Sequence, residues 1–369
     1  MGQAQRLKEL MNYASEDKVN SNSTNPGASP VLIVPYVWIG DFVRCHSVVK
    51  VLRIRWPHRP VDLITSSLCA PLLDYMPGVR QGIVCDLPRG QLPIGRYLTL
   101  GRRLKAEQYG TALIMLRTWK AALAPFLAGI PVRTGFVGEL RFGLLNDLRW
   151  GERRLTRMID CMGVLALPKG VKPLPEWPLP EIVVPSDQVT TWLERRALAA
   201  PPRPLVALAP GAVGPGKRWA THNYAELARR LTAQGIGVWV LGGPNEAPFA
   251  REIVTAAGDR ARDLTGNDLR DAIIALAAVD AAVTNDSGLM HVAAAIGAPT
   301  IALFGPTDPR LWAPLNPLAA AIEPPSDRPC PRCARRNCND VHHRDVDEIA
   351  VERVFDAVTK ALVPRFRSS

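Results

Sequence analysis

The sequence contains no long hydrophobic run. A membrane-spanning helix needs ~20 apolar residues, and the most apolar stretch, residues 111–130, is interrupted by Arg117 and Lys120. Residues 1–30 are polar and lack the apolar core of an export signal. We therefore expect neither a transmembrane segment nor secretion, and we expect residues 1–30 to form a disordered extension.

Cysteine is scarce and does not follow a disulfide pattern. The 369 residues include seven cysteines, an odd number, and four of them lie apart in apolar segments. Such usage is typical of reduced thiols in a cytoplasmic protein and argues against a disulfide scaffold.

The sequence also lacks a recognisable nucleic-acid-binding module. Aromatic residues make up 6% of the chain, and the basic residues are scattered rather than interleaved with them. The net charge is nevertheless +11, from 45 Lys and Arg against 34 Asp and Glu. This surplus favours an anionic partner, such as a phosphorylated substrate or an anionic membrane surface, or it is only a solvated basic surface.

What the sequence does contain is two series of short apolar segments separated by helical patterns. This alternation predicts an α/β protein with two Rossmann-like, doubly wound parallel sheets. The expected strands are residues 31–34, 61–65, 83–87 and 111–116 in the first series, and 205–209, 237–241, 281–284 and 300–304 in the second.

A proline-rich segment separates the two series. Residues 168–185 contain six prolines, which remove backbone donors and stiffen the chain, so we predict a linker there. The expected domains are residues 31–167 and 186–369, facing a cleft, with the last helix able to pack back on the first domain. Ligands of parallel sheets bind at the carboxyl ends of the strands.

The most informative motif is the run TNDSGLMH at residues 284–291, between a strand and an alanine-rich helix. Asp286 and Ser287 are residue types that begin helices, and Gly288 allows a close backbone approach. The free amides and the dipole of a helix start bind phosphate. His291 lies one turn into the helix and can point back toward a ligand.

Three further strand ends carry polar residues. Asp41 follows the first strand and is either a helix-start acid or a general base. The loop at residues 210–219 has three glycines before Lys217 and Arg218, so it either neutralises a diphosphate or is a flexible surface loop; it lacks the Ser or Thr of a Walker loop. Glu246 could accept from ribose hydroxyls or serve as a helix-start acid.

Residues 330–343 form a cysteine- and histidine-rich loop. Its members could bind zinc in a Cys3His arrangement, although only one CxxC pair is present, and reduced cysteines in a loop are the alternative. The candidate ligands are Cys330, Cys333, Cys338 and His342.

At these motifs the chain resembles the ADP-heptose:lipopolysaccharide heptosyltransferases, most closely their type II members. Besides the 284–291 run, the matching stretches are AGIPVRTG at 128–135, GLLND at 143–147, and PGA with GKRW at 210–219. Four ordered matches are far more specific than any one of them. The chain departs from the family pattern in its extension of about 30 residues and in residues 117–120, where a more polar stretch is expected.

The resemblance implies a glycosyltransferase-B fold and a metal-free, inverting transfer of heptose from ADP-heptose to the lipopolysaccharide inner core. The second heptose would be added to heptosyl-Kdo2-lipid A at the cytoplasmic face of the inner membrane, by peripheral contact. Residues 31–167 would bind the acceptor and residues 186–369 the donor. The implied roles are as follows: Asp41 as catalytic base; Lys217 at the diphosphate; Gly216, Glu246, Asp286, Ser287, Gly288 and His291 as donor contacts; and Lys120 and Arg133 on the acceptor side.

Two other readings stay open on sequence alone. The first is an enzyme of the same fold, a transferase or epimerase, that acts on a different nucleotide sugar. The second is a non-catalytic protein that uses the 330–343 loop and the basic surface to bind zinc or nucleic acid.

Overall fold

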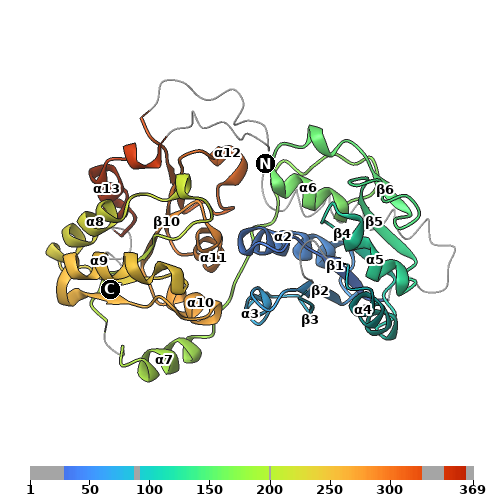
Figure 1. Ribbon diagram of the computed structural model, residues 1–369, viewed down its shortest axis with the longest axis horizontal. Helices are drawn as coiled ribbons and strands as arrows, with labels where there is room; N and C mark the ends of the chain where they lie inside the picture. Colours follow the sequence, from blue (N-terminus) through green and yellow to red (C-terminus); the bar gives the residue numbers. More distant parts are fainter. Residues whose placement is uncertain (1–28, 87–91, 199–200, 326–344, 363–369) are drawn as a thin grey trace. The chain divides into compact units, whose positions relative to one another are not determined.

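The computed structural model describes residues 29–86, 92–198, 201–325 and 345–362 (Figure 1). The expected extension at residues 1–30 lies almost entirely outside this part. The chain divides into two compact units between Pro180 and Glu181, a boundary inside the proline-rich segment. Each unit contains one parallel sheet, as the sequence predicts, and each sheet has six strands where four were expected.

The first unit is built around the strand order β3-β2-β1-β4-β5-β6. Strand β1 is central, and β2 and β3 follow it toward one edge of the sheet. The chain then crosses over, and β4, β5 and β6 extend the sheet toward the other edge. The strands are β1 (Val31–Val34), β2 (Val61–Thr65), β3 (Gln81–Val84), β4 (Thr111–Ile114), β5 (Val132–Phe136) and β6 (Asp147–Arg149). The helices are α2 (Ile39–Arg55), α3 (Ala70–Leu73), α4 (Ile94–Ala106), α5 (Trp119–Leu127) and α6 (Met158–Gly163).

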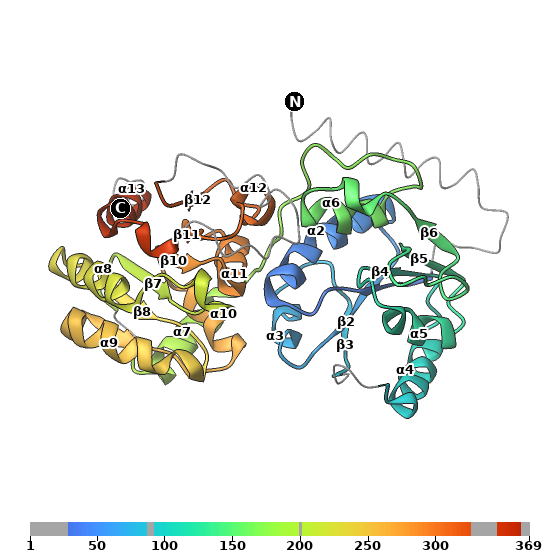
Figure 2. The same cartoon turned by 45° about the horizontal axis from the view of Figure 1, so that its top comes forward.

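Helices cover both faces of this sheet. Successive strand side chains point to opposite faces, so β1 contributes Leu32 and Val34 to the core beneath α4 and α5, while Val31 and Ile33 point to the other face. Figure 2 shows α4 and α5 on one side of the sheet and α2 and α6 on the other. Burial on both faces explains why β1 is an uninterrupted apolar segment.

A buried carboxylate links strands β2 and β3 to the end of α4. Asp62 in β2 is fully buried and accepts hydrogen bonds from Arg80 Nε at 2.9 Å, from Gln81 Nε2 at 3.1 Å and from the Tyr109 hydroxyl at 2.6 Å. Burial and the hydrogen bond to Asp62 raise the pKa of Tyr109. The network gives the buried Asp62 carboxylate three donor side chains.

We expect Asp62→Ala to destabilise the protein by about 2–4 kcal/mol, because it leaves buried donors without an acceptor. Arg80 is 39% exposed and can be partly rehydrated, which limits the loss. Urea unfolding measures the effect. Glu107→Gln is the matched control, since Glu107 contacts the same arginine at 2.9 Å from a partly exposed position. Equal losses in the two variants would contradict the assignment.

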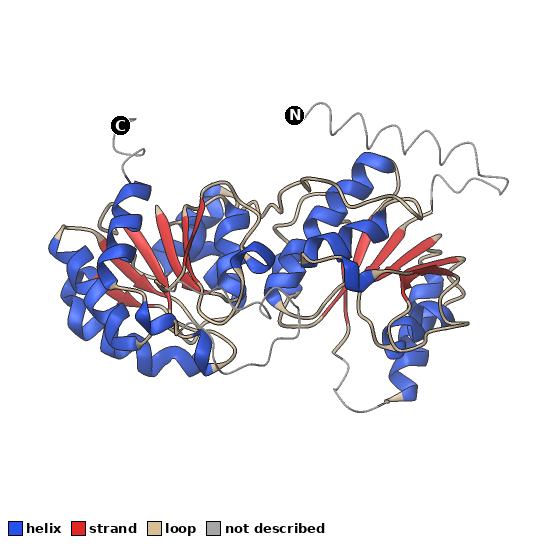
Figure 3. Cartoon of the chain, turned by 90° about the horizontal axis from the view of Figure 1, so that it is seen from above, coloured by secondary structure: helices blue, strands red, loops and turns tan. Residues whose placement is uncertain are grey.

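The second unit repeats the topology with the strand order β12-β11-β10-β7-β8-β9. Its strands lie between helices, as in the first unit (Figure 3). The strands are β7 (Leu205–Ala209), β8 (Gly237–Val240), β9 (Ala261–Asp263), β10 (Ala281–Asn285), β11 (Thr300–Leu303) and β12 (Ala319–Ile322). The helices are α7 (Ser186–Arg195), α8 (Thr221–Ala233), α9 (Ala247–Ala257), α10 (Leu269–Ala277), α11 (Gly288–Ile296), α12 (Pro309–Trp312) and α13 (Val351–Leu362).

The last described helix completes the core of its own unit. One side of α13 buries Val354, Val358 and Leu362 in the same apolar cluster as strand β7 and helices α8 and α9. The packing of the last helix on the first domain, which the sequence left open, stays a prediction.

Candidate functional site

The crossover point of the second sheet lies between β7 and β10. These two strands are neighbours, yet the chain leaves β7 toward β8 on one side and leaves β10 toward β11 on the other. At such a point the loops after the strands diverge, and open parallel sheets bind ligands there. The loop at 210–218 and the start of α11 both lie at this edge, because they follow β7 and β10 directly.

A lysine and an aspartate from these two loops meet at the crossover. Lys217 Nζ lies 2.7 Å from Asp286 Oδ2, and the Thr307 hydroxyl donates to the same oxygen at 2.7 Å. Lys217 is 32% exposed, so the ammonium group is held in place but accessible. Both predicted site residues are therefore brought together, and Thr307, which follows β11, joins them.

Asn285 fixes the geometry of this pair. Its side chain is fully buried, donates to Pro210 O at 2.7 Å, and accepts from Trp219 N and from the Tyr224 hydroxyl, both at 3.2 Å. These bonds tie the end of β10 to both ends of the 210–219 loop. The loop is therefore anchored at both ends, which distinguishes it from a flexible surface loop.

The start of α11 presents polar groups without helical partners. The helix begins at Gly288, so its first amides have no acceptor within the helix. Ser287 is the N-cap residue, but its side chain makes no capping bond, and its buried Oγ has no hydrogen-bond partner within the described residues. His291 is the fourth residue of α11 and is 6% exposed.

Glu246 spans two loops of the same edge. Its Oε2 accepts from Gly243 N at 2.9 Å, which is the helix-start role considered for it. A Cβ atom at Gly211 would lie 2.9 Å from Glu246 Cδ, so the carboxylate packs directly on the loop after β7. Gly216 is exposed, and a Cβ atom there would meet nothing within 4 Å, which leaves the backbone beside Lys217 open.

The first unit presents its own carboxylate at the corresponding point, after β1. Asp41 lies in the first turn of α2, and its Oδ1 is 3.1 Å from Arg44 Nη1. The side chains of Asp41 and Arg44 are 12% and 4% exposed. The Asp41 carboxylate is therefore held in place beside the crossover, unlike a solvated helix-start acid.

The neighbouring strand β4 ends at the same crossover of the first sheet. Arg117 follows it and pairs with Glu152 at 3.0 Å, and Lys120 lies in the first turn of α5, with its ammonium 6.0 Å from the Trp119 ring centre. Asp41 and Lys120 therefore follow adjacent strands, β1 and β4, and share the carboxyl edge of this sheet.

Arg133 does not join this group. It is the second residue of β5, toward the amino end of that strand, and its Nε donates to Leu144 O at 2.7 Å. Asn146 Oδ1 accepts from Arg133 N at 2.8 Å, and Thr134 donates to Asp147 Oδ2 at 2.9 Å. Desolvation lowers the pKa of Arg133. The motifs at 128–135 and 143–147 thus contact one another, and Arg133 links β5 to the segment before β6.

No group of three or more potential metal ligands occurs within residues 29–86, 92–198, 201–325 and 345–362. The candidate zinc ligands Cys330, Cys333, Cys338 and His342 lie outside these ranges. Among the described helices, none has the length and hydrophobicity to span a bilayer.

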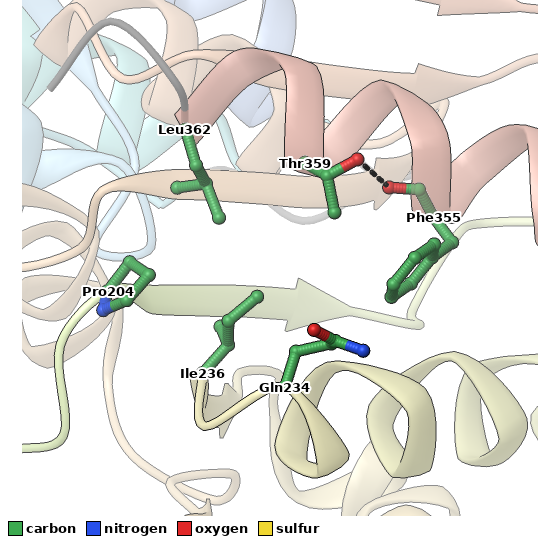
Figure 4. Close-up of a pocket in the computed structure, with 6 residues that line it drawn as sticks. All are labelled: Pro204, Gln234, Ile236, Phe355, Thr359 and Leu362. Carbon is green, nitrogen blue, oxygen red and sulfur yellow. Dashed lines mark hydrogen bonds between the residues drawn. The ribbon is translucent and has the colours of Figure 1, made fainter. Parts of the chain in front are cut away.

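A pocket of about 330 Å³ lies at the opposite edge of the second sheet. Pro204 and Ile236, which line it, immediately precede β7 and β8, and Phe355, Thr359 and Leu362 of α13 close its other side (Figure 4). The loops that carry Lys217 and Asp286 are at the carboxyl ends of the strands, so this pocket is separate from them.

Known proteins resemble this chain along almost its full length. The profile of glycosyltransferase family 9 (heptosyltransferase) matches residues 97–344. Lipopolysaccharide heptosyltransferase 2 of Escherichia coli K12 is 35% identical over 346 residues, which cover 90% of this chain and 98% of that protein. The corresponding Salmonella typhimurium protein is 38% identical over 305 residues, covering 79% and 87%.

The fold comparison agrees. The solved structure of E. coli ADP-heptose lipopolysaccharide heptosyltransferase II superposes with a TM-score of 0.80 at 32% identity, covering 91% of this chain and 99% of the other. With its two six-stranded parallel sheets and this coverage, the chain belongs to glycosyltransferase family 9, the heptosyltransferase family.

Proposed function

We propose that the protein transfers heptose from ADP-heptose to the inner core of lipopolysaccharide, adding the second heptose to heptosyl-Kdo2-lipid A. The observation that carries the proposal is the convergence of Lys217, Asp286 and the start of α11 at the crossover of the second sheet, in a chain of this family. Both relatives named above are lipopolysaccharide heptosyltransferases 2.

The second unit binds the donor. The amides at the start of α11 and the Ser287 hydroxyl are donors suited to phosphate oxygens, and Lys217 supplies the positive charge. Asp286 uses Oδ2 to orient Lys217 and Thr307, which leaves Oδ1 for a donor hydroxyl. One carboxylate oxygen of Glu246 accepts a hydrogen bond from Gly243 N, and its second oxygen can accept from a ribose hydroxyl.

The first unit supplies the base. Asp41 removes the proton of the acceptor hydroxyl as that oxygen attacks the anomeric carbon of the heptose. The new carbon–oxygen bond forms, the bond to the diphosphate breaks with inversion, and ADP leaves with the electron pair. Negative charge grows on the diphosphate in the transition state, so fixed donors there accelerate the reaction. No metal ion is required in this scheme.

The acceptor is anchored in a bilayer by its lipid A. We therefore place the protein at the cytoplasmic face of the inner membrane, attached by peripheral contact. The charge surplus of +11 supports this, because an anionic leaflet attracts basic proteins. Lys120, at the carboxyl edge of the first sheet, is positioned for the anionic groups of the acceptor core.

A donor titration tests the proposal. We expect ADP-heptose to bind at least about tenfold more tightly than UDP- and GDP-sugars, since the adenine must fit a site selected for it. Calorimetry measures the affinities, and transfer to core fragments with and without the first heptose measures acceptor choice. Preference for a uridine or guanosine nucleotide would refute the donor, and equal transfer to both fragments would refute the acceptor.

A further inference from the structure

Helix α4 exposes an apolar stripe that the core of the first unit does not use. It buries Tyr97, Leu100 and Leu104 against the sheet, whereas Ile94 is 61% exposed and Leu98 is 40% exposed. Ile94 and Leu98 are four residues apart and therefore share one side of the helix. A helix that served only the core would carry polar residues there.

The stripe continues onto α5. Gly101 of α4 lies against the end of α5, where a Cβ atom would be 3.0 Å from Leu127 Cβ. Phe126 and Leu127 are 43% and 39% exposed. At about 100° per residue, Leu98 and Arg102 stand on the side of α4 adjacent to Gly101. The exposed side chains Ile94, Leu98, Phe126 and Leu127 thus lie on two adjacent helices, and we call these four residues the α4–α5 surface.

Positive charge lies beside this surface on α4. Helix α4 carries four exposed basic residues and no acidic one. Arg102 and Lys105 are on the same side as Leu98, while the remaining two are on the opposite flank. The four residues are Arg96, Arg102, Arg103 and Lys105. A basic helix that exposes bulky apolar side chains is suited to the headgroup region of an anionic bilayer.

We propose that the α4–α5 surface binds the protein to an anionic membrane, with Ile94 and Leu98 inserted at the headgroup boundary and Arg102 and Lys105 on lipid phosphates. The proposal deepens the proposed function, because it identifies the membrane-facing surface. Helix α4 follows β3 and so begins at the carboxyl edge of the first sheet, the edge that carries Asp41. Seating α4 on the bilayer brings that edge close to a lipid-anchored acceptor.

Vesicle sedimentation tests the surface directly. The full-length protein should bind phosphatidylglycerol vesicles and not phosphatidylcholine vesicles. Arg102→Gln with Lys105→Gln should weaken binding roughly 30-fold, because each basic residue near the surface contributes about 1 kcal/mol. Ile94→Ser with Leu98→Ser should weaken vesicle binding on the order of tenfold, and this loss should persist at high salt.

The control is the double variant Arg251→Gln with Leu318→Ser, which replaces one exposed basic residue and one exposed apolar residue of the second unit.

Transfer assays separate this inference from the proposed function. The α4 variants should keep wild-type activity on a water-soluble core fragment that lacks acyl chains, and should lose activity on the same acceptor in vesicles. Vesicle binding equal to wild type in both variants, or an equal loss in the control, would overturn the membrane surface. A change in oligomeric state without a change in vesicle binding would show a protein interface instead. Absence of transfer by the wild type would refute the function and leave the surface standing.

Discussion

Asp41→Asn should lower kcat by about 10²–10⁴-fold, the contribution of a positioned general base. The substitution keeps the size of the side chain and a hydrogen-bond acceptor for Arg44, which lies 3.1 Å from Asp41 Oδ1. It removes the group that accepts the proton of the acceptor hydroxyl. Since the donor is bound by the second unit in this scheme, the Kd for ADP-heptose should stay within about twofold of wild type.

Single-turnover transfer and calorimetry of ADP-heptose binding measure the two quantities separately. Asp187→Asn is the matched control, because Asp187 is also an acid in the first turn of a helix but is exposed on α7. An amide there should change neither quantity. If Asp41→Asn retained wild-type kcat, another group would have to be the base, and Asp41 would be left with the helix-start role alone.

The strands that sequence reasoning located best are those buried on both faces. The expected bounds of residues 31–34 and 205–209 match β1 and β7, which are central strands and apolar throughout. The bounds 61–65 match β2 as well, although this strand carries the buried Asp62. Strands β6 and β9, which each have three residues and carry charges, were missed. Both are edge strands with a neighbouring strand on one side only. An edge strand is less buried than a central one and does not need to be apolar along its whole length.

Helix α4 was missed for a different reason. Its apolar residues Ile94, Tyr97, Leu98, Leu100 and Leu104 lie on one half of the helix. Tyr97, Leu100 and Leu104 are buried, whereas Ile94 and Leu98 are exposed. Sequence periodicity indicates that a helix has an apolar side, but it does not say how much of that side the core covers.

The site was predictable to the extent that strand ends define it. Lys217 and Asp286 follow adjacent parallel strands, so their proximity could be inferred before any coordinates. Thr307 follows β11 and was available to the same argument, yet it was overlooked. A family motif does not say at which end of its strand a residue lies, so the position of Arg133 near the amino end of β5 could not be foreseen; its acceptor role stays a prediction. Arg44, one helical turn after Asp41, gave no separate signal.

Lys217→Met should reduce kcat by about 10²–10³-fold, the usual effect of removing one fixed donor from a group that gains charge in the transition state. The ammonium lies 2.7 Å from Asp286 Oδ2. Before the donor binds, Asp286 therefore holds the lysine in one position, and no reorganisation is needed when charge develops on the leaving ADP. KM should rise less than kcat falls, because the contact strengthens in the transition state.

The variant also leaves Asp286, which is 9% exposed, without its partner and close to an anionic ligand. ADP should consequently bind more weakly to Lys217→Met than to the double variant Lys217→Met with Asp286→Asn, which removes the stranded carboxylate as well. Lys217→Arg should retain part of the activity, and Thr307→Val should affect kcat less than Lys217→Met. Pre-steady-state kinetics and ADP calorimetry on these four proteins distinguish a leaving-group contact from an ion pair that only stabilises the fold. If Lys217 served the fold alone, the double variant would recover kcat together with stability, whereas a leaving-group role predicts that stability and ADP binding recover while kcat stays low.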